Sequence, residues 1–132
     1  MIERAREKDI PVRGYVSCVM GCPYDGEVNP QNVEYVTNKL LDMGCYEVSL
    51  GDTIGAGTPA KTEILMKTLT APKSKLAAHF HDTNKTAIEN ILVALKYGIT
   101  IFDSSVGGLG GCPYAGKPAG NVSSEDVIFV LE

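Results

Sequence analysis

The sequence predicts an α/β protein built on a parallel sheet, either a β/α barrel or an open doubly wound sheet. Short apolar runs alternate with amphipathic stretches, and strands begin near residues 12, 46, 76 and 99. This repeated β–α order is typical of parallel strands joined by crossover helices. Polar and glycine-rich segments follow the strands and precede the helices. In such folds the carboxyl ends of the strands carry the chemistry.

The first two units each combine a strand pattern with helix start signals. Residues 12–19 and 46–50 are rich in β-branched and apolar residues and predict strands. Asn29-Pro30 and Thr58-Pro59 predict helix starts, because proline suits the first helical position, and Gly44 ends the first helix. Apolar residues recur at helical spacing in both helices: Val33, Val36, Leu40 and Met43, then Ile64, Leu65 and Leu69.

The second half of the chain repeats the pattern. Residues 75–81 and 99–103 predict the third and fourth strands, and Gly98 ends the helix between them. The apolar stripe of that helix comprises Ile88, Ile91, Leu92 and Leu95. Ser123 and Asp126 resemble a capping box before a last apolar stretch. The charged residues 1–9 predict the end of a surface helix.

Size and composition limit the classes of function. The 132 residues suffice for one compact domain, and the net charge of −4 gives no reason to expect nucleic acid or an anionic membrane as partner. No apolar run approaches the roughly 18 residues of a spanning helix. The 4 cysteines form no C-x-x-C pair. They predict free or buried thiols rather than a structural zinc site.

His79 and His81 are the sharpest local signal. Residues two apart in a strand point to the same face, so the two imidazoles are expected side by side near a strand end. Neutral imidazole is a common metal ligand near pH 7. The alternative is a pair of core histidines bonded to the backbone, or a solvated strand end. Metal binding and this alternative both remain open on the pattern alone.

Asp52 and Cys112 each lie in a loop that follows a strand. The Asp52 carboxylate could bind a metal, orient a histidine or act as an acid–base group, or it could cap its own turn. Cys112 lies in a glycine-dense loop, residues 104–121, whose length suits a lid that excludes water from a reactive intermediate. The alternative is a flexible loop with an incidental cysteine.

Four motifs together resemble the hydroxymethylglutaryl-CoA lyase family over nearly the whole chain. They are Val12-Arg13-Gly14-Tyr15-Val16-Ser17-Cys18, Ser49-Leu50-Gly51-Asp52-Thr53-Ile54-Gly55, His79-Phe80-His81-Asp82-Thr83 and Ser105-Val106-Gly107-Gly108-Leu109-Gly110-Gly111-Cys112-Pro113-Tyr114. The cysteine loop is the most specific of the four. The histidine and L-G-D-T motifs are shared with related metal-dependent aldol and Claisen enzymes.

The resemblance implies that residues 1–132 are the C-terminal half, about four β/α units, of a TIM (β/α)₈ barrel. They would form strands 5–8 of a pyruvate-carboxyltransferase-like or hydroxymethylglutaryl-CoA lyase catalytic domain. The implied reaction is metal-dependent cleavage of 3-hydroxy-3-methylglutaryl-CoA to acetyl-CoA and acetoacetate, in leucine degradation and ketone-body formation. The implied location is the cytoplasm in a bacterium and the mitochondrial matrix in a eukaryote.

The same resemblance assigns roles to individual residues. His79, His81 and Asn121 match the metal ligands of the family, and the ion would be Mg²⁺ or Mn²⁺. Cys112 matches the lid cysteine and Asp52 an aspartate of the catalytic pocket, while His81 or Asp52 could relay a proton. The substrate would be an acyl-CoA thioester.

The chain departs from the family pattern in two ways. A further metal-binding aspartate and a catalytic arginine of the first barrel strand, and a glutamate of the second, have no counterpart here. We therefore expect weak metal binding and little turnover unless another chain, either a second copy or a missing N-terminal half, completes the barrel. Asn84-Lys85 also stands where the family commonly has an aromatic residue and then glycine.

Two other functions compete with the lyase. One is a related Claisen condensation enzyme of the isopropylmalate or homocitrate synthase kind, which would share the histidine pair but not the cysteine loop. The other is a non-catalytic, truncated product that oligomerises, because four strands alone leave unpaired edges.

Overall fold

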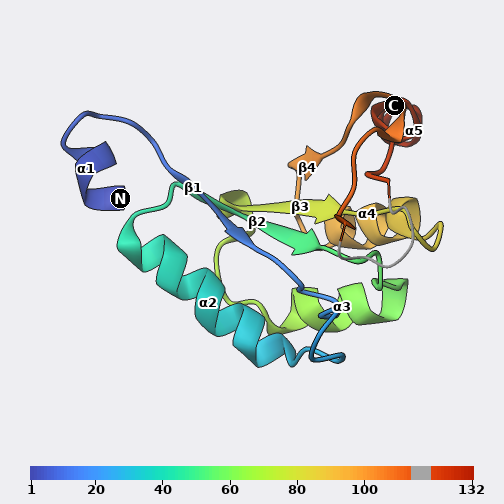
Figure 1. Cartoon of the computed structure of the whole chain (residues 1–132), viewed down its shortest axis with the longest axis horizontal. Helices are drawn as coiled ribbons and strands as arrows, with labels where there is room; N and C mark the ends of the chain where they lie inside the picture. Colours follow the sequence, from blue (N-terminus) through green and yellow to red (C-terminus); the bar gives the residue numbers. More distant parts are fainter. Residues whose placement is uncertain (114–119) are drawn as a thin grey trace.

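The computed structural model describes residues 1–113 and 120–132, which form one parallel sheet of order β1-β2-β3-β4 (Figure 1). The strands are β1 (Arg13–Val16), β2 (Glu47–Asp52), β3 (Leu76–Phe80) and β4 (Phe102–Asp103). Each strand pairs with the next along the chain. A doubly wound sheet reverses its strand order at a switch point, whereas a barrel keeps sequential order. The observed order therefore identifies the fold as part of a barrel.

Helices connect successive strands, as the sequence predicts. The crossovers are α2 (Pro30–Met43), α3 (Pro59–Thr68) and α4 (Ala87–Lys96). Outside the repeat lie α1 (Ile2–Arg6), α5 (Ser124–Leu131) and the short 3₁₀ turns η1 (Lys73–Lys75) and η2 (Val106–Gly108). None of the helices in the described residues is long and apolar enough to cross a membrane.

The predicted helix ends are confirmed by their cap geometry. The side chain of Asn29 accepts a hydrogen bond from the N–H of Gln31 at 3.0 Å. Thr58 and Ser123 cap α3 and α5 in the same way. Gly44 ends α2 with φ 106°, a left-handed conformation that favours glycine. These local contacts explain why the sequence alone locates the helices.

Three strands are shorter than predicted, the third, Leu76–Phe80, by only one residue at each end. The first strand ends at Val16 because Cys18 adopts φ 60°, which turns the chain out of the extended conformation, and the Cys18 N–H donates to Thr53 Oγ1 at 2.8 Å. The fourth strand, predicted over residues 99–103, comprises only Phe102–Asp103. Within the described residues it is an edge strand, paired on one side with β3.

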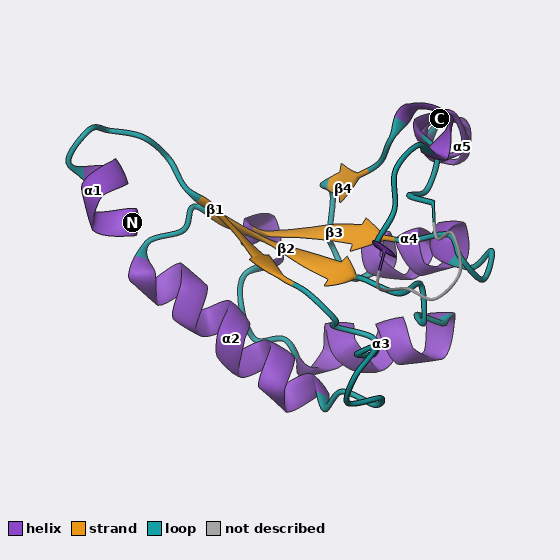
Figure 2. Ribbon diagram, in the orientation of Figure 1, coloured by secondary structure: helices purple, strands orange, loops and turns teal. Residues whose placement is uncertain are grey.

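The two faces of the sheet differ in what covers them. Helices α2, α3 and α4 lie together on one side, while α5 lies beyond β4 (Figure 2), so that in the described residues none of the three crossover helices covers the other side. The helix side buries the apolar core, which includes Val16, Val48, Leu50, Leu65, Met66, Leu76, Ala78, Phe80 and Ile91. The uncovered side carries the alternate residues of each strand. These are the residues that would face the interior of a closed barrel.

Candidate active site

The two histidines lie side by side at the carboxyl end of β3. Their ring centroids are 5.2 Å apart and the ring planes meet at 54°. His79 pairs in register with Gly51 of β2 and Asp103 of β4. Because paired residues on neighbouring strands point to the same face, both imidazoles lie on the uncovered side of the sheet. Strand alternation alone predicts this arrangement.

The two rings have different surroundings. His81 is 6% exposed, and its Nδ1 is buried without a hydrogen-bond partner. Burial lowers the pKa of His81 and the neighbouring His79 lowers it further, against the opposing effects of the Thr53 backbone and the Asn121 side chain. His81 is therefore neutral near pH 7, the form that can give its lone pair to a metal.

Asn121 joins the pair from a distant part of the chain. It forms an isolated antiparallel bridge with His81, and the adjacent Asp82 N–H donates to the Gly120 carbonyl at 3.0 Å. The Asn121 Nδ2 donates to the Leu109 carbonyl at 2.9 Å. This bond fixes the amide, whose side chain lies close enough to His81 to raise its pKa. His79, His81 and Asn121 are thus brought to one edge of the sheet.

These three residues suit a divalent cation, although the described chain does not complete its coordination. Two imidazoles and an amide are the mixed nitrogen and oxygen donors that such ions accept, and the unpartnered His81 Nδ1 leaves a buried lone pair or N–H unsatisfied. Within residues 1–113 and 120–132 no three side chains among histidine, cysteine, aspartate and glutamate gather around one point. An ion held by these three donors would therefore keep open coordination positions.

A carboxylate that the sequence patterns did not single out lies beside His79. Asp103 ends β4, and its Oδ2 is 3.5 Å from His79 Nδ1. Ser49 Oγ donates to the same oxygen at 2.8 Å. Arg13 Nη1 lies 2.9 Å from Asp103 Oδ1, and Arg13 Nε lies 2.6 Å from Glu47 Oε1. The polar network Arg13–Glu47–Ser49–Asp103 therefore runs across three strands to the histidine pair.

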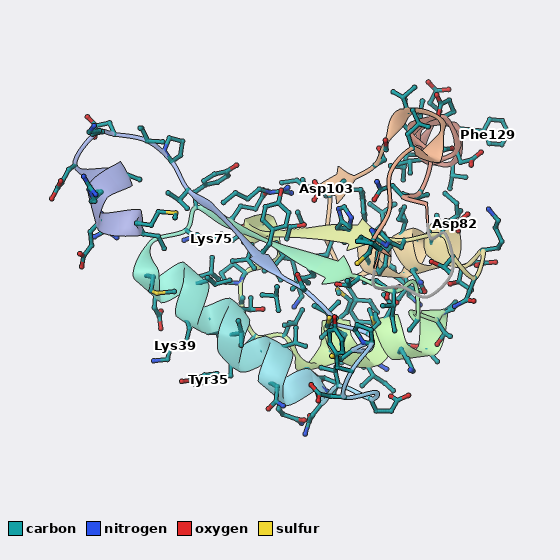
Figure 3. The ribbon with its side chains drawn as sticks, viewed as in Figure 1. Tyr35, Lys39, Lys75, Asp82, Asp103 and Phe129 are labelled. Atoms are coloured by element: carbon teal, nitrogen blue, oxygen red, sulfur yellow. The ribbon has the colours of Figure 1, made fainter. Side chains whose placement is uncertain are left out.

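The polar network keeps Arg13 protonated and positively charged. Burial lowers the pKa of Arg13, but hydrogen bonds to Glu47, Asp103 and Tyr15 outweigh that effect and raise it. Asp103 lies on the side of the sheet opposite α2 and α3 (Figure 3). Strand alternation could have suggested this carboxylate, since residues 101 and 103 share a face. Its partners are set by strand register, which no local pattern contains.

Asp52 lies on the other face of the sheet from the histidines. Because it follows Leu50 by two residues, it shares a face with the core residues Val48 and Leu50, and it is completely buried. Its Oδ1 accepts from the Ala56 N–H at 2.9 Å and its Oδ2 from the Gly57 N–H at 2.8 Å. Burial raises the pKa of Asp52, against these backbone donors, which lower it. The carboxylate caps its own loop, the alternative that its sequence position left open.

Cys112 is half-buried in the part of its loop that the structure describes, and residues 114–119 of the predicted lid lie outside the described residues. Gly111 and Gly120 form an antiparallel bridge at the base of the loop. Burial raises the pKa of Cys18, and the nearby thiols of Cys22 and Cys112 raise it further, against Thr53. Cys112 is thus close to the end of β1. All 4 cysteines are free thiols.

Asn84 and Lys85 depart from the family pattern, and Asn84 links the loop after β3 to the loop after β2. Asn84 Nδ2 donates to the Gly55 carbonyl at 2.7 Å, in the loop that Asp52 caps. Lys85 adopts φ 59° and pairs with Asp82 Oδ2 at 3.1 Å. A lysine therefore occupies a left-handed position that favours glycine, the residue that the family pattern commonly has there.

A cavity of about 200 Å³ lies over the histidine pair, lined by Tyr15, Val16, Ser17, Gly51, Thr53, His79 and His81. Ligand pockets for drug-sized molecules are larger, about 300–1,000 Å³. The cavity is therefore too small to hold a molecule as large as an acyl-CoA, and it would form only part of such a binding site. A larger hollow of about 530 Å³ lies between α1 and the end of α2 and contains no histidine or cysteine.

Comparison with known proteins agrees with the fold. A model of the HMGL-like family matches residues 1–132. The chain belongs to the HMGL-like family. It is 55% identical over 133 residues to the 3-hydroxy-3-isohexenylglutaryl-CoA/hydroxy-methylglutaryl-CoA lyase of Pseudomonas aeruginosa, covering 99% of this chain and 44% of that protein. It is 57% identical over 129 residues to the mitochondrial hydroxymethylglutaryl-CoA lyase of Arabidopsis thaliana, covering 96% and 28%.

The structural comparison gives the same result for this HMGL-like chain. The crystal structure of hydroxymethylglutaryl-CoA lyase from Pseudomonas aeruginosa superimposes with a TM-score of 0.95 at 55% identity, over 98% of this chain and 44% of that one. The predicted fold class, part of a TIM barrel, is thereby confirmed. The chain spans less than half the length of these relatives. Relatives in this HMGL-like family carry both mitochondrial and cytoplasmic names.

Proposed function

We propose that the chain is part of a metal-dependent lyase that cleaves 3-hydroxy-3-methylglutaryl-CoA to acetyl-CoA and acetoacetate. The observation that carries the proposal is the His79–His81 pair beside Asn121, at the carboxyl ends of the strands and on the face without helices. High identity to proteins named as this lyase supports the substrate. We propose the cytoplasm as its location in a bacterium and the mitochondrial matrix in a eukaryote; the eukaryotic relatives carry both mitochondrial and cytoplasmic names.

The chemistry requires a proton to leave the tertiary hydroxyl while the carbon–carbon bond breaks and an acetyl-CoA enolate forms. Mg²⁺ or Mn²⁺ held by His79, His81 and Asn121 would lower the pKa of that hydroxyl and stabilise the developing charge. His81 is neutral because burial lowers its pKa, so its ring suits a lone-pair donor or a proton acceptor. The Cys112 thiol would return a proton to the enolate carbon.

Asp52 has a different role in this proposal from the one that the family resemblance implies. Its carboxylate faces the helix layer and accepts the N–H groups of Ala56 and Gly57. We therefore propose that it acts by fixing the loop after β2, which carries Thr53 at the edge of the cavity. Of the two relay candidates this leaves His81, which accepts a proton only while its single lone pair is not bound to the metal.

Catalysis also requires groups that this chain does not supply. The described residues bring two histidines and one amide to the proposed metal site. The family resemblance places a further metal-binding aspartate and a catalytic arginine on the first barrel strand, and a glutamate on the second. We propose that this chain functions when the remaining strands close the barrel over the polar face. The acyl-CoA substrate would then bind between the two halves.

Complementation tests this proposal. The chain is mixed with a separately produced polypeptide that carries the part of the Pseudomonas aeruginosa lyase absent from the match, with Mg²⁺ or Mn²⁺ present. We expect acetoacetate to form from hydroxymethylglutaryl-CoA in the mixture and not with either part alone. His79→Ala should abolish this recovery, whereas Asp42→Ala, an exposed change on α2, should not.

Other outcomes identify the rival functions. Condensation of an α-keto acid with acetyl-CoA, without cleavage of hydroxymethylglutaryl-CoA, would assign the chain to the Claisen synthases. A soluble complex of the two parts without either activity would identify a non-catalytic oligomerising product.

A further inference from the structure

Asp103 occupies a defined position relative to His79. The two residues pair across β3 and β4 and point to the same face of the sheet. Asp103 Oδ2 lies 3.5 Å from His79 Nδ1. The atom of His79 that faces the carboxylate is therefore Nδ1, which leaves Nε2 as the ring nitrogen available to another ligand.

The Asp103 carboxylate cannot rotate freely because side chains from β1 and β2 hold it. Ser49 Oγ donates to Oδ2 at 2.8 Å, and Arg13 Nη1 lies within 3.0 Å of both oxygens. Arg13 is itself fixed by Glu47 at 2.6 Å. The side chains of Arg13 and Asp103 are 19% and 23% exposed, so solvent screens these charges only in part.

A carboxylate that is ionised accepts hydrogen bonds and donates none, so it stabilises the histidine tautomer that carries its proton on Nδ1. In metalloproteins a second carboxylate often fixes the orientation of a ligating histidine in this way. His81 has no such partner, because its Nδ1 is buried and unpaired. The two histidines of the site are thus held by different means.

We propose that Asp103 is a positioning residue, which holds His79 with its proton on Nδ1 and its Nε2 lone pair free for a divalent cation. This inference rests on the metal site of the proposed function. It adds Arg13 and Ser49 as the residues that keep Asp103 in place. Glu47, Arg13 and Asp103 carry two negative charges and one positive charge, and the excess negative charge beside His79 favours a cation.

The first test observes the tautomer directly, without metal or substrate. The ring nitrogens of ¹⁵N-histidine-labelled chain are recorded by NMR at about pH 8, above the ordinary histidine pKa of about 6.5. Because the chain has 2 histidines, loss of one ring signal in His81→Gln assigns the other. We expect the Nδ1–H form to predominate at His79. In Asp103→Leu the Nε2–H form should become the major one, whereas Asp42→Leu, an exposed change on α2, should leave the spectrum unchanged.

The second test measures Mn²⁺ affinity of the same chains by electron paramagnetic resonance. We expect Asp103→Leu to weaken Mn²⁺ binding about tenfold, the lower end of the effect of losing such a partner. Ser49→Ala removes one donor and keeps the carboxylate, so it should shift both readouts in the same direction by less. Ser49→Ala also replaces Asp103→Leu in both tests if the amide NMR spectrum of Asp103→Leu loses the dispersion of a folded chain.

An unchanged His79 tautomer in folded Asp103→Leu, or in Ser49→Ala where only that variant folds, would overturn the proposal. A tautomer shift without loss of Mn²⁺ affinity would overturn the part that concerns the metal. Neither readout uses substrate. A failure of lyase complementation with both effects present would therefore count against the proposed reaction and not against the role of Asp103.

Discussion

Ser49 and Leu50 are neighbours on β2, yet they belong to two different environments. Leu50 is 1% exposed among apolar residues beneath the helices, whereas Ser49 donates to Asp103 in the polar network on the uncovered face. The helix-covered face is a core in its own right. The polar face is organised by ion pairs that connect β1, β2 and β4. Stability and chemistry are thus separated onto opposite faces of one sheet.

Truncation on the apolar face should have the largest effect on stability. Leu50→Ala removes a buried side chain at the centre of the sheet, and we expect it to lower the free energy of unfolding by about 2–5 kcal/mol. Leu92→Ala, at a helix position that is 44% exposed, should cost no more than about 0.5 kcal/mol. Urea denaturation measures both. Equal losses would show that the helix-covered face is not the core.

Breaking the polar network should have a smaller effect. Arg13→Met leaves Glu47 and Asp103 without their cation, and because the pair is only partly buried we expect a loss of about 1–2 kcal/mol in urea denaturation. Arg4→Met, on the exposed surface of α1, is the matched control and should be nearly neutral. If the two variants are equally stable, the network contributes nothing to the fold.

The pH dependence of stability distinguishes Asp52 from the polar face. Burial raises its pKa in the folded chain, so the folded state retains a proton that the unfolded state has lost. Stability is therefore highest below the ordinary aspartate pKa of about 3.9 and falls as pH rises through the folded pKa. We expect the wild type to lose stability relative to Asp52→Asn as the pH rises above about 4. Exposed Asp42→Asn should show no such trend in the same urea series, and a parallel trend in the two variants would contradict the prediction.

The smallest expected effect concerns the loop after β3, beside the polar face. Lys85→Gly relieves φ 59° but gives up an exposed ion pair and backbone entropy, for a net gain of about 0.5 kcal/mol. Lys85→Ala keeps the backbone strain and loses only the ion pair, so it should not stabilise. Thermal unfolding of both variants measures the difference. A gain for alanine equal to that for glycine would show that the backbone conformation is not the cause.

Local patterns predicted most of the fold. The caps at Asn29, Thr58 and Ser123 and the left-handed Gly44 placed the helices, because these contacts lie within a few residues of one another. The predicted limits of the strands were less accurate than those of the helices. The positive φ of Cys18, which ends the first strand, coincides with its contact to Thr53, 35 residues away. The short fourth strand reflects pairing on one side within the described residues.

The candidate site also combines features that a local pattern predicts with features that it does not. Strand alternation by itself put His79 and His81 on one face, since that relation needs only the two-residue period of an extended chain. Applied to Val48, Leu50 and Asp52, the same period would have placed Asp52 with the core. The contacts of His79 with Asp103, and of His81 with Asn121, depend on how separate segments align. No pattern within a single segment contains that alignment.

Local sequence patterns are enough to predict the repeated strand–helix order, the helix limits and the paired imidazoles. Each of these follows from backbone geometry or from contacts between near neighbours along the chain. Tertiary structure alone decided which face each polar residue joins in the assembled sheet, and which carboxylate stands beside His79. These depend on strand register and on the covering of one face by helices, which arise only when distant segments bury apolar surface together.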